Sequence, residues 1–361
     1  MESVVAAVET AVQLPGFQAA ASGWAPAAST RDFGPAGALM GYDFHIAADG
    51  PRLIEVNTNA GGAFLNQALA SAQQVCCQEV QSLVGAIVLP GNFGDQIAAM
   101  FISEWRRQRG AGRPATIATV DDNPEGQFMF PEFELARSLL EARGVTTIIV
   151  DPAALRFDGS RLWFSDIAID LVYNRLVDFA LAEPHHDALR AAYESGSVVV
   201  TPNPHNHAFL ADKRNLMLLS DSELLAAWGL AVKHRKVLAA AVPATVIIDA
   251  SNADHLWADR RNQFFKPAGG HSSKAAYRGE KVTRKVWAEI LQGGYVAQAY
   301  APPSGRIIVR DGMPVEFKLD VRLYTYAGAT LLAAARLYQG QTTNMRTPGG
   351  GFAPVLQIIN G

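Results

Sequence analysis

The chain has 361 residues, of which 49% are hydrophobic and 18% charged, and its formal net charge is −3. This length predicts two or three packed lobes with a sizeable core, and the weak charge gives no reason to expect a nucleic-acid or acidic-membrane partner. No apolar run reaches the roughly 20 residues that span a bilayer. The N-terminal MESVVAAVET has no basic region of the kind that begins a signal peptide, so we expect a cytoplasmic protein.

The chain has two cysteines, Cys76 and Cys77, which are adjacent and lie in a helical pattern. Neighbouring cysteines cannot join distant segments. We therefore expect reduced thiols in a cytoplasmic protein, and a vicinal redox pair is the alternative.

In the first half of the chain, residues 42–62 are predicted to form a strand hairpin, and residues 64–85 and 91–109 are predicted to be helices. Farther on, strands are expected at 115–122, 145–151, 169–175 and 197–202, with an amphipathic helix at 130–144. Strand–helix–strand at this spacing predicts a parallel βαβ unit, so residues 113–205 are expected to form a small α/β lobe.

The second half predicts a helix at 211–229 and strands at 242–248, 262–267 and 295–302. Residues 305–340 alternate as antiparallel strands do, with turns at Asp311-Gly312 and Ala327-Gly328. A parallel lobe followed by an antiparallel region makes the predicted fold class an α+β and α/β composite, with a cleft between its parts.

The predicted first hairpin carries three oxygen donors, Asp43, Glu55 and Asn57. Glu55 and Asn57 are two residues apart, so they share a face of their strand. Hard cations such as Mg²⁺ take oxygen ligands and bridge nucleotide phosphates. We therefore predict a magnesium site here, and a polar outer face of the hairpin is the alternative.

A second candidate site lies in FFKPAGGHSSK, where Lys266 ends a strand before a loop of small residues. Backbone N–H groups in such a loop can approach phosphate oxygens, and the lysine adds a positive charge. The predicted phosphate loop contains Gly269, Gly270, His271, Ser272 and Ser273. His271 either contacts phosphate or lies on an exposed tip, and an ordinary Gly/Ser loop is the alternative to the whole site.

The alternating segment VEFKLDVRLYTY places five polar or aromatic side chains on one face of a strand: Lys318, Asp320, Arg322, Tyr324 and Tyr326. This face is either a cleft wall or exposed to solvent. The next strand ends at Arg336, and Asn344 and Arg346 follow before three glycines. That last segment is interpreted as a lid over a substrate or as a surface hairpin.

Polar residues in the predicted α/β lobe leave alternatives open. Asn174 and Arg175 end a strand, and Arg175 either binds a substrate carboxylate or forms a salt bridge between lobes. His185-His186 and the pair His205 and His207 lie in Pro-rich connections without carboxylates at ligand spacing, so a transition-metal site is not predicted.

Taken together, these motifs resemble the ATP-grasp superfamily, with similarity to bacterial glutathione synthetase and D-alanine–D-alanine ligase. ADK at 211–213 and FFKP resemble the two segments with nucleotide-binding lysines, Lys213 and Lys266, and YVAQAYAP resembles the hinge strand beside the adenine. DFHIAADGPRLIEVNTNAGG is similar to the magnesium motif. In the family this motif ordinarily follows a segment that resembles ARLYQGQTTNMRTPGGG, which begins just before Arg336. Here that segment lies at the end of the chain instead, so the resemblance implies a circularly permuted ATP-grasp fold.

The resemblance implies a division of the chain into four parts. Residues 36–66 would be the magnesium-binding part of the ATP-grasp region, 67–112 a helical segment, 113–205 the preceding α/β substrate lobe, and 206–361 the nucleotide-binding region.

The resemblance also implies ATP and two Mg²⁺ ions as cofactors, with the metals on Asp43, Glu55 and Asn57. The catalytic residues would be Arg336, Arg322 and Asn344. The nucleotide-binding residues would be Lys213, Lys266, Gly269, Gly270, His271, Ser272, Ser273, Gln298, Ala299, Tyr300, Lys318 and Asp320.

The activity implied is a ligase that makes an acylphosphate from a small carboxylate and ATP and passes the acyl group to an amine or thiol. A kinase on the same scaffold and a nucleotide-binding regulator without turnover are the alternatives. The helices at 64–109 are a candidate interface for a homodimer.

Overall fold

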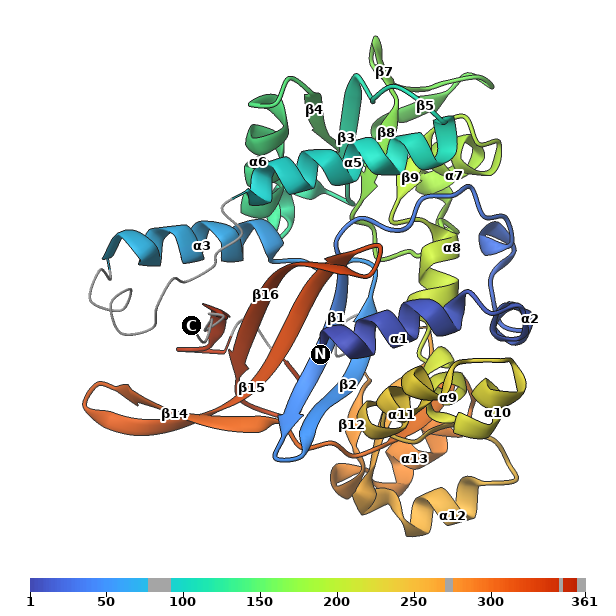
Figure 1. Ribbon diagram of the computed structural model, residues 1–361, viewed down its shortest axis with the longest axis vertical. Coiled ribbons are helices and arrows are strands. Elements are labelled where there is room, and N and C mark those ends of the chain that lie inside the picture. Colours follow the sequence, from blue (N-terminus) through green and yellow to red (C-terminus); the bar gives the residue numbers. More distant parts are fainter. Residues whose placement is uncertain (77–91, 270–274, 344–346, 356–361) are drawn as a thin grey trace.

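The computed structural model describes residues 1–76, 92–269, 275–343 and 347–355. Figure 1 shows a parallel lobe at one end, a large antiparallel sheet in the middle, and a second antiparallel sheet with its helices at the other end. None of the helices within the described ranges combines the length and apolar character that crossing a membrane requires.

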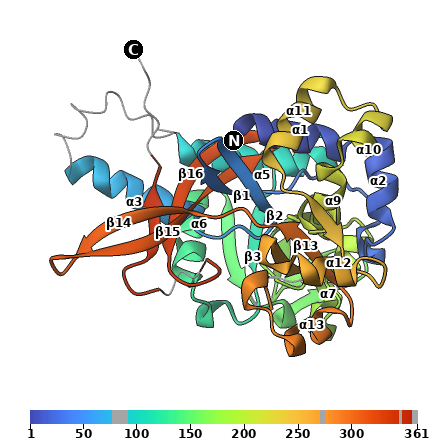
Figure 2. The same ribbon diagram turned by 90° about the horizontal axis from the view of Figure 1, so that it is seen from below.

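The largest sheet joins the beginning of the chain to its end. Its strand order is β17-β16-β15-β1-β2, with β14 paired to β15, and all of its pairs are antiparallel. The strands are β1 (Met40–Ala47), β2 (Gly50–Asn57), β14 (Ser304–Arg310), β15 (Met313–Tyr326), β16 (Ala329–Tyr338) and β17 (Gly351–Pro354). In this register Asp43 lies opposite Glu55 on one side and Arg322 on the other. The first hairpin and the last strands therefore form one continuous surface (Figures 1 and 2).

The two predicted turns of this sheet are confirmed. Asp311 and Gly312 have φ values of 51° and 77°, and Ala327 and Gly328 have values of 47° and 80°. Positive φ at both central residues matches the twist of the flanking strands in a two-residue hairpin turn.

The middle of β15 is buried on both faces. On the polar face Asp320 is 2% exposed and Arg322 is 7% exposed, while Phe317 on the other face is 1% exposed. The alternative of a solvent-exposed polar face is therefore wrong for the middle of this strand.

A second antiparallel sheet has the order β10-β13-β11-β12. Its strands are β10 (Thr245–Ile247), β11 (Gln263–Pro267), β12 (Tyr277–Arg278) and β13 (Tyr295–Ala299), and the nearby helices are α12 (Ala253–Ala258) and α13 (Arg284–Ile290). Phe265 and Trp287 pack edge to face in the core beneath this sheet. Alternation along β11 then leaves Phe264 and Lys266 on the opposite face.

The predicted parallel unit is present, with order β4-β3-β8-β9 and only parallel pairs. Its elements are β3 (Thr116–Val120), α6 (Phe130–Glu141), β4 (Thr146–Val150), β8 (Leu171–Asn174), α7 (Asp187–Glu194) and β9 (Val199–Thr201). A small antiparallel sheet, for which no prediction was made, lies between β4 and β8: β5 (Leu155–Phe157), β6 (Leu162–Phe164) and β7 (Ile167–Ile169).

Two predicted helices precede this lobe, and the structure describes α3 (Ala63–Cys76) and α5 (Phe93–Arg109). Cys77 and the rest of 77–91 lie outside the described residues. Phe101 of α5 packs against Tyr173 of β8, and the buried Glu104 accepts a hydrogen bond from Thr201 of β9. The helix therefore shares a core with the lobe that begins at residue 113.

The single helix predicted at 211–229 is wrong. The chain instead forms a π-helical turn, η5 (His207–Ala211), and then α9 (Asn215–Ser220) and α10 (Ser222–Ala227). Asp221 interrupts the pattern because its side chain accepts from the N–H groups of Glu223 and Leu224, which makes it the N-cap of a new helix.

The sequence predicted no element in residues 1–35. The structure has α1 (Glu2–Val12) and α2 (Pro15–Ser22) there, and they pack with α11 (Val232–Ala241) over the sheet (Figure 1). The remaining short helices are α8 (Pro204–Asn206) and the 3₁₀ turns η1 (Ala27–Ser29), η2 (Pro124–Gly126), η3 (Pro152–Ala154), η4 (Pro184–His186), η6 (Arg260–Asn262) and η7 (Gly279–Lys281).

Candidate functional site

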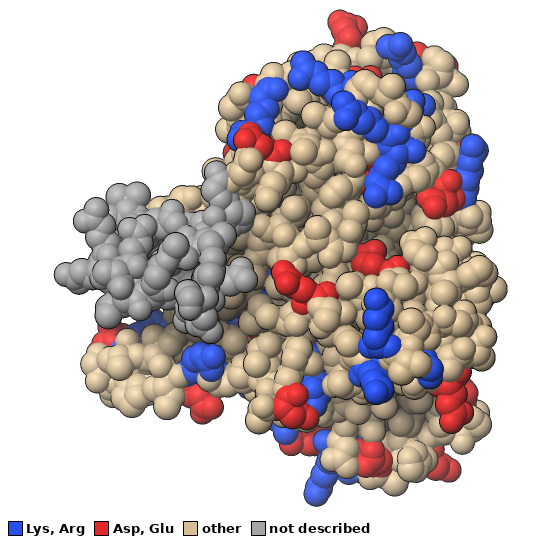
Figure 3. All heavy atoms as spheres, in the orientation of Figure 1, with Lys and Arg blue, Asp and Glu red and all other residues tan. Residues whose placement is uncertain are grey.

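A pocket of about 300 Å³ lies between the two antiparallel sheets. Five of its described lining residues are basic, and one is acidic. The basic residues are Lys213, Lys266, Arg278, Lys318 and Arg322, and the acidic one is Glu55. In contrast, basic and acidic side chains are both scattered over the outer face drawn in Figure 3. A pocket with this excess of positive charge favours a ligand with several negative charges.

Lys266 connects the two sheets at the pocket. Its Nζ donates to the carbonyl of Ile54 and to Oε1 of Gln298, both at 2.8 Å. Burial lowers the pKa of Lys266 to about 8; the nearby Glu55 opposes this shift, and Lys213 adds to it. The ammonium group therefore loses its proton more easily than that of an ordinary lysine, and an anionic ligand would stabilise its charged form.

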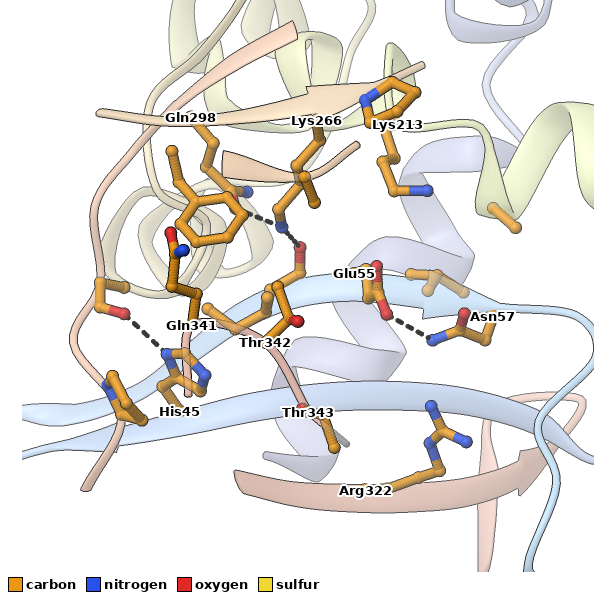
Figure 4. Close-up of a pocket in the computed structure, with 18 of the residues that line it drawn as sticks. His45, Glu55, Asn57, Lys213, Lys266, Gln298, Arg322, Gln341, Thr342 and Thr343 are labelled. Carbon is orange, nitrogen blue, oxygen red and sulfur yellow. Dashed lines mark hydrogen bonds between the residues drawn. The ribbon is translucent and has the colours of Figure 1, made fainter. Parts of the chain in front are cut away.

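Lys213 lies between η5 and α9 and reaches the same pocket, as Figure 4 shows. Its backbone N–H donates to the carbonyl of Ala268 at 3.2 Å, which places it beside the start of the predicted phosphate loop. Gly269 is exposed there. The rest of that loop, Gly270, His271, Ser272 and Ser273, lies outside the described residues, so its contact with phosphate stays a prediction.

Gln298, Ala299 and Tyr300 line the pocket as the predicted hinge should. The N–H groups of Ala299 and Tyr300 already donate to the carbonyls of Ala244 and Asn262, each at 2.8 Å. They are therefore engaged within the protein. Side chains offer donors instead, because Gln298 Nε2 and the Nε of Arg278 are buried without an acceptor in the described part of the chain. Buried donors of this kind fit a polar ligand.

The three predicted oxygen donors come together. Asn57 Nδ2 lies 3.0 Å from Asp43 Oδ2 and 3.3 Å from Glu55 Oε1. Glu55 and Asn57 line the pocket (Figure 4), whereas Asp43 is not a lining residue and is 2% exposed. A polar outer face of the hairpin is therefore the wrong interpretation. The Glu55 carboxylate and the Asn57 carboxamide oxygen fit the oxygen ligands that Mg²⁺ takes.

The Asp43 carboxylate forms ion pairs with two arginines. Arg322 donates to it through Nε at 2.6 Å and Nη2 at 2.7 Å, and Arg336 Nη2 lies 2.8 Å away. Burial by itself would raise the pKa of Asp43, but the two guanidinium groups outweigh it and lower that pKa well below its usual value. Asp43 would therefore reach a metal ion only after an arginine moved.

Arg336 is held away from the pocket lining. Its Nε lies 2.5 Å from Asp320 Oδ1, and the Asp320 Oδ2 atom accepts from Thr343 at 2.6 Å. Lys318 lines the pocket and donates to the carbonyl of Gly340. Asp320 thus contacts Arg336 and Thr343 rather than the pocket, while Asn344 and Arg346 lie outside the described residues.

Several lining residues were absent from the sequence prediction. His45, whose Nδ1 lies 2.6 Å from the carbonyl of Ala301, follows Asp43 by two residues, and Phe264 precedes Lys266 by two. The two-residue period of a strand could have revealed both.

Phe179 and His207 stack with ring centroids 3.7 Å apart and also line the pocket. Burial lowers the pKa of His207 to about 3, with a further contribution from Lys213. These two residues come from separate elements, so no local sequence signal joins them.

Four residues singled out near the parallel sheet lie outside the pocket lining: Asn174, Arg175, His185 and His186. Arg175 is 5% exposed, donates through Nη1 to the Tyr173 hydroxyl, and has no ion pair within 4.0 Å among the described residues. The buried Nε of Arg175 lacks an acceptor, so its proposed binding of a substrate carboxylate stays a prediction. His185 and His186 do have a carboxylate partner, Asp122, brought from a distant part of the sequence.

No protein-family model and no curated protein sequence matches this chain. Among solved structures, a putative gamma-glutamylcysteine synthetase from Methylobacillus flagellatus KT matches with a TM-score of 0.54 at 10% identity, over 98% of this chain and 87% of that one. The ATP-grasp ligase PsnB complexed with minimal precursor matches at 13% identity and a TM-score of 0.33, over 68% and 90% of the two chains.

D-alanyl-alanine synthetase A from Vibrio cholerae O1 biovar eltor str. N16961 also gives a TM-score of 0.33, at 14% identity over 58% of this chain and 67% of that one. A TM-score of 0.33 does not establish that two chains share a fold. The fold assignment depends on the match that spans nearly the whole chain, together with two antiparallel sheets that enclose a basic pocket. On this evidence the chain has the ATP-grasp fold.

Proposed function

We propose that this chain is an ATP-dependent ligase that joins a small carboxylate to an amine or thiol and releases ADP and phosphate. The observation that carries the proposal is the pocket in an ATP-grasp fold, whose described lining contains five basic side chains and a single carboxylate. Phosphoryl transfer depends on positioning and charge neutralisation more than on covalent catalysis. A pocket of this composition suits a triphosphate.

The lining residues have different proposed roles in binding and catalysis. Lys213 and Lys266 would hold the phosphates from the side of the smaller sheet, and Arg322 would face the transferred phosphoryl group from the larger one. Mg²⁺ bound at Glu55 and Asn57 would neutralise charge on the β- and γ-phosphate oxygens. Arg336 does not line the pocket, so Arg322 takes the first catalytic role and Arg336 supports it through their shared partner Asp43.

The reaction proceeds in two displacements. An oxygen of the substrate carboxylate attacks the γ-phosphorus, the bond to the bridging oxygen breaks, and ADP leaves with that electron pair. The amine or thiol of the second substrate then attacks the carbonyl carbon, phosphate leaves with the electrons of the C–O bond, and the proton of the attacking group passes to solvent. Arg322 would stabilise the oxyanion formed in the second step.

A release assay with ATP and Mg²⁺ tests this proposal. Single and paired amino acids, polyamines and small peptides are screened, beginning with amino acids because the similar Methylobacillus protein is a putative gamma-glutamylcysteine synthetase. We expect ADP and free phosphate only when a carboxylate and an acceptor are both present. ADP without free phosphate would identify a kinase, and nucleotide binding without turnover would identify a regulator.

The variant Glu55→Gln tests the metal assignment within this proposal. It keeps the size of the side chain and its contact with Asn57 but removes the negative charge, so we expect turnover to fall by at least about 100-fold with nucleotide binding and fold retained. Glu316→Gln, an exposed position in β15, is the matched control and should be fully active. Full activity of Glu55→Gln would remove the metal assignment.

A further inference from the structure

Two histidines and an aspartate converge at the carboxyl edge of the parallel sheet. Asp122 follows β3 by two residues, while His185 and His186 lie in η4, which comes after β8. The Nε2 atoms of His185 and His186 lie 3.0 Å and 2.9 Å from the same oxygen, Asp122 Oδ1. None of the three residues lines the nucleotide pocket, so the cluster has no part in the reaction proposed above.

The two hydrogen bonds of His186 need more N–H donors than a neutral ring has. Its Nε2 faces Asp122, and its Nδ1 lies 2.9 Å from Oδ2 of Asp178. A neutral imidazole has one N–H, whereas two carboxylate oxygens need two donors. Since the His186 side chain is fully buried, water does not supply the missing donor. Either an additional proton is shared between Nε2 and Asp122, or a cation lies between them.

The arrangement around His186 is that of a metal ligand. Histidines that bind metals through one nitrogen generally donate the other N–H to a carboxylate, and Asp178 occupies that position. In a tetrahedral site with bonds of about 2.0–2.1 Å, ligand atoms lie roughly 3.4 Å apart. The three candidate ligand atoms already lie within 4.8 Å of one another, so a small inward or outward shift creates the site.

We propose that Asp122, His185 and His186 bind a divalent transition metal, for which Zn²⁺ is the probe, and that Asp178 positions His186. Two imidazole nitrogens and one carboxylate oxygen suit Zn²⁺ better than Mg²⁺. The Asp122 and His185 side chains are 38% and 45% exposed, so a fourth ligand such as water has access. The metal would tie the segment after β3 to the connection between β8 and α7.

Calorimetric titration of metal-stripped full-length chain with Zn²⁺ tests the site. Cys76→Ser and Cys77→Ser remove the competing thiols, and excess Mg²⁺ occupies the predicted site at Glu55 and Asn57. We expect one Zn²⁺ per chain and affinity at least about 10-fold weaker in His185→Ala. His185 is the variant of choice because its side chain is half-exposed, so its loss should leave the fold intact.

Two further variants separate the metal site from a simple ion-pair cluster. His255→Ala, an exposed histidine elsewhere, should bind Zn²⁺ like the parent chain. Asp178→Asn should weaken binding about 10- to 100-fold without changing the stoichiometry, because Asp178 sets the orientation of His186. Absence of Zn²⁺ binding, or equal affinity in His185→Ala and the parent, would overturn the proposal and leave these residues as a hydrogen-bonded cluster. Either result is independent of the ligase assay.

Discussion

Asp43 and Glu55 are carboxylates on one hairpin, but their surroundings give them different roles. Asp43 is buried and paired with two arginines, whereas Glu55 lines the pocket and accepts a hydrogen bond from Asn57. Removing one partner from a buried ion pair leaves uncompensated charge in a medium of low dielectric constant. Asp43 therefore matters for the fold as well as for the site, and Glu55 matters mainly for the ligand.

We predict that Asp43→Ala lowers the free energy of unfolding by about 3–5 kcal/mol, because it leaves Arg322 and Arg336 buried beside the vacant position. Glu55→Ala on the neighbouring strand should change it by about 1 kcal/mol or less. Urea denaturation of both variants measures the difference. Equal destabilisation would show that the arginines find other partners or water.

Lys266 makes nucleotide binding dependent on pH. Its pKa of about 8 in the folded chain means that the ammonium charge disappears as pH rises through this value. We predict that the affinity for a non-hydrolysable ATP analogue falls between about pH 7 and pH 10, above the range in which histidines titrate. Lys266→Met should bind weakly with no such fall, and a parallel fall in both chains would assign the effect to another group.

The same lysine affects stability in the opposite direction. The unfolded chain keeps its proton up to the ordinary lysine pKa, so from about pH 8 to pH 10.5 the unfolded state binds more protons than the folded state. This group's contribution to stability therefore rises with pH in that window, while ligand affinity falls.

At the scale of elements, a single side chain decides where one helix ends and the next begins. Hydrophobic spacing continues through residues 211–229, yet Asp221 stops α9 and caps α10 through two backbone N–H groups. Capping satisfies donors that a helix start otherwise leaves without partners. The break also sets the directions of α9 and α10, which both contribute to the core around α11.

We predict that Asp221→Ala destabilises the chain by about 1 kcal/mol, the usual cost of losing an N-cap side chain. Asp221→Asn, which keeps an oxygen acceptor, should restore most of the loss. Chemical denaturation of the two variants provides the test, and equal stability of Asp221→Ala and the parent would mean that water replaces the cap.

At the scale of the whole molecule, the site exists only where distant parts of the chain meet. Lys266 reaches Ile54 across 212 residues, and Arg322 reaches Asp43 across 279. The hairpin at the start of the chain pairs with β15 near its end and completes the larger sheet. A circularly permuted fold requires the first and last strands of the chain to lie close together in this way. Circular permutation itself stays a prediction.

A rearranged chain tests that prediction. Residues 361 and 1 are joined by a flexible Gly/Ser linker, and new ends are opened at Gly110–Gly112, an exposed loop in which a Cβ at Gly110 would meet no atom within 4 Å. We expect cooperative unfolding and nucleotide affinity close to the parent, since exposed loops tolerate new termini. New ends within the β15–β16 turn serve as the control and should disrupt the sheet. Failure of the Gly110–Gly112 chain alone would show that the present order is needed for folding.

The sequence predicted local elements well where one period dominated. The parallel strands and the two turns of the large sheet were identified because alternation, apolar runs and glycine positions report directly on backbone geometry. The same reasoning placed Glu55 and Lys266 at the pocket. It missed α1 and α2, although Val4, Val8 and Ala11 of α1 are buried at helical spacing. It missed the break at Asp221 because side-chain capping does not change the hydrophobic period.

By itself, the sequence determined which residue types stood at which strand positions, and hence that carboxylates, lysines and arginines would share faces of particular strands. Only the tertiary structure decided which of them meet a ligand. It buried Asp43 between two arginines, left Glu55 in the pocket and brought Asp122 to His185 and His186. The physical reason is that strand and helix periods act over a few residues, whereas charge pairing and burial depend on segments that approach only when the chain has folded.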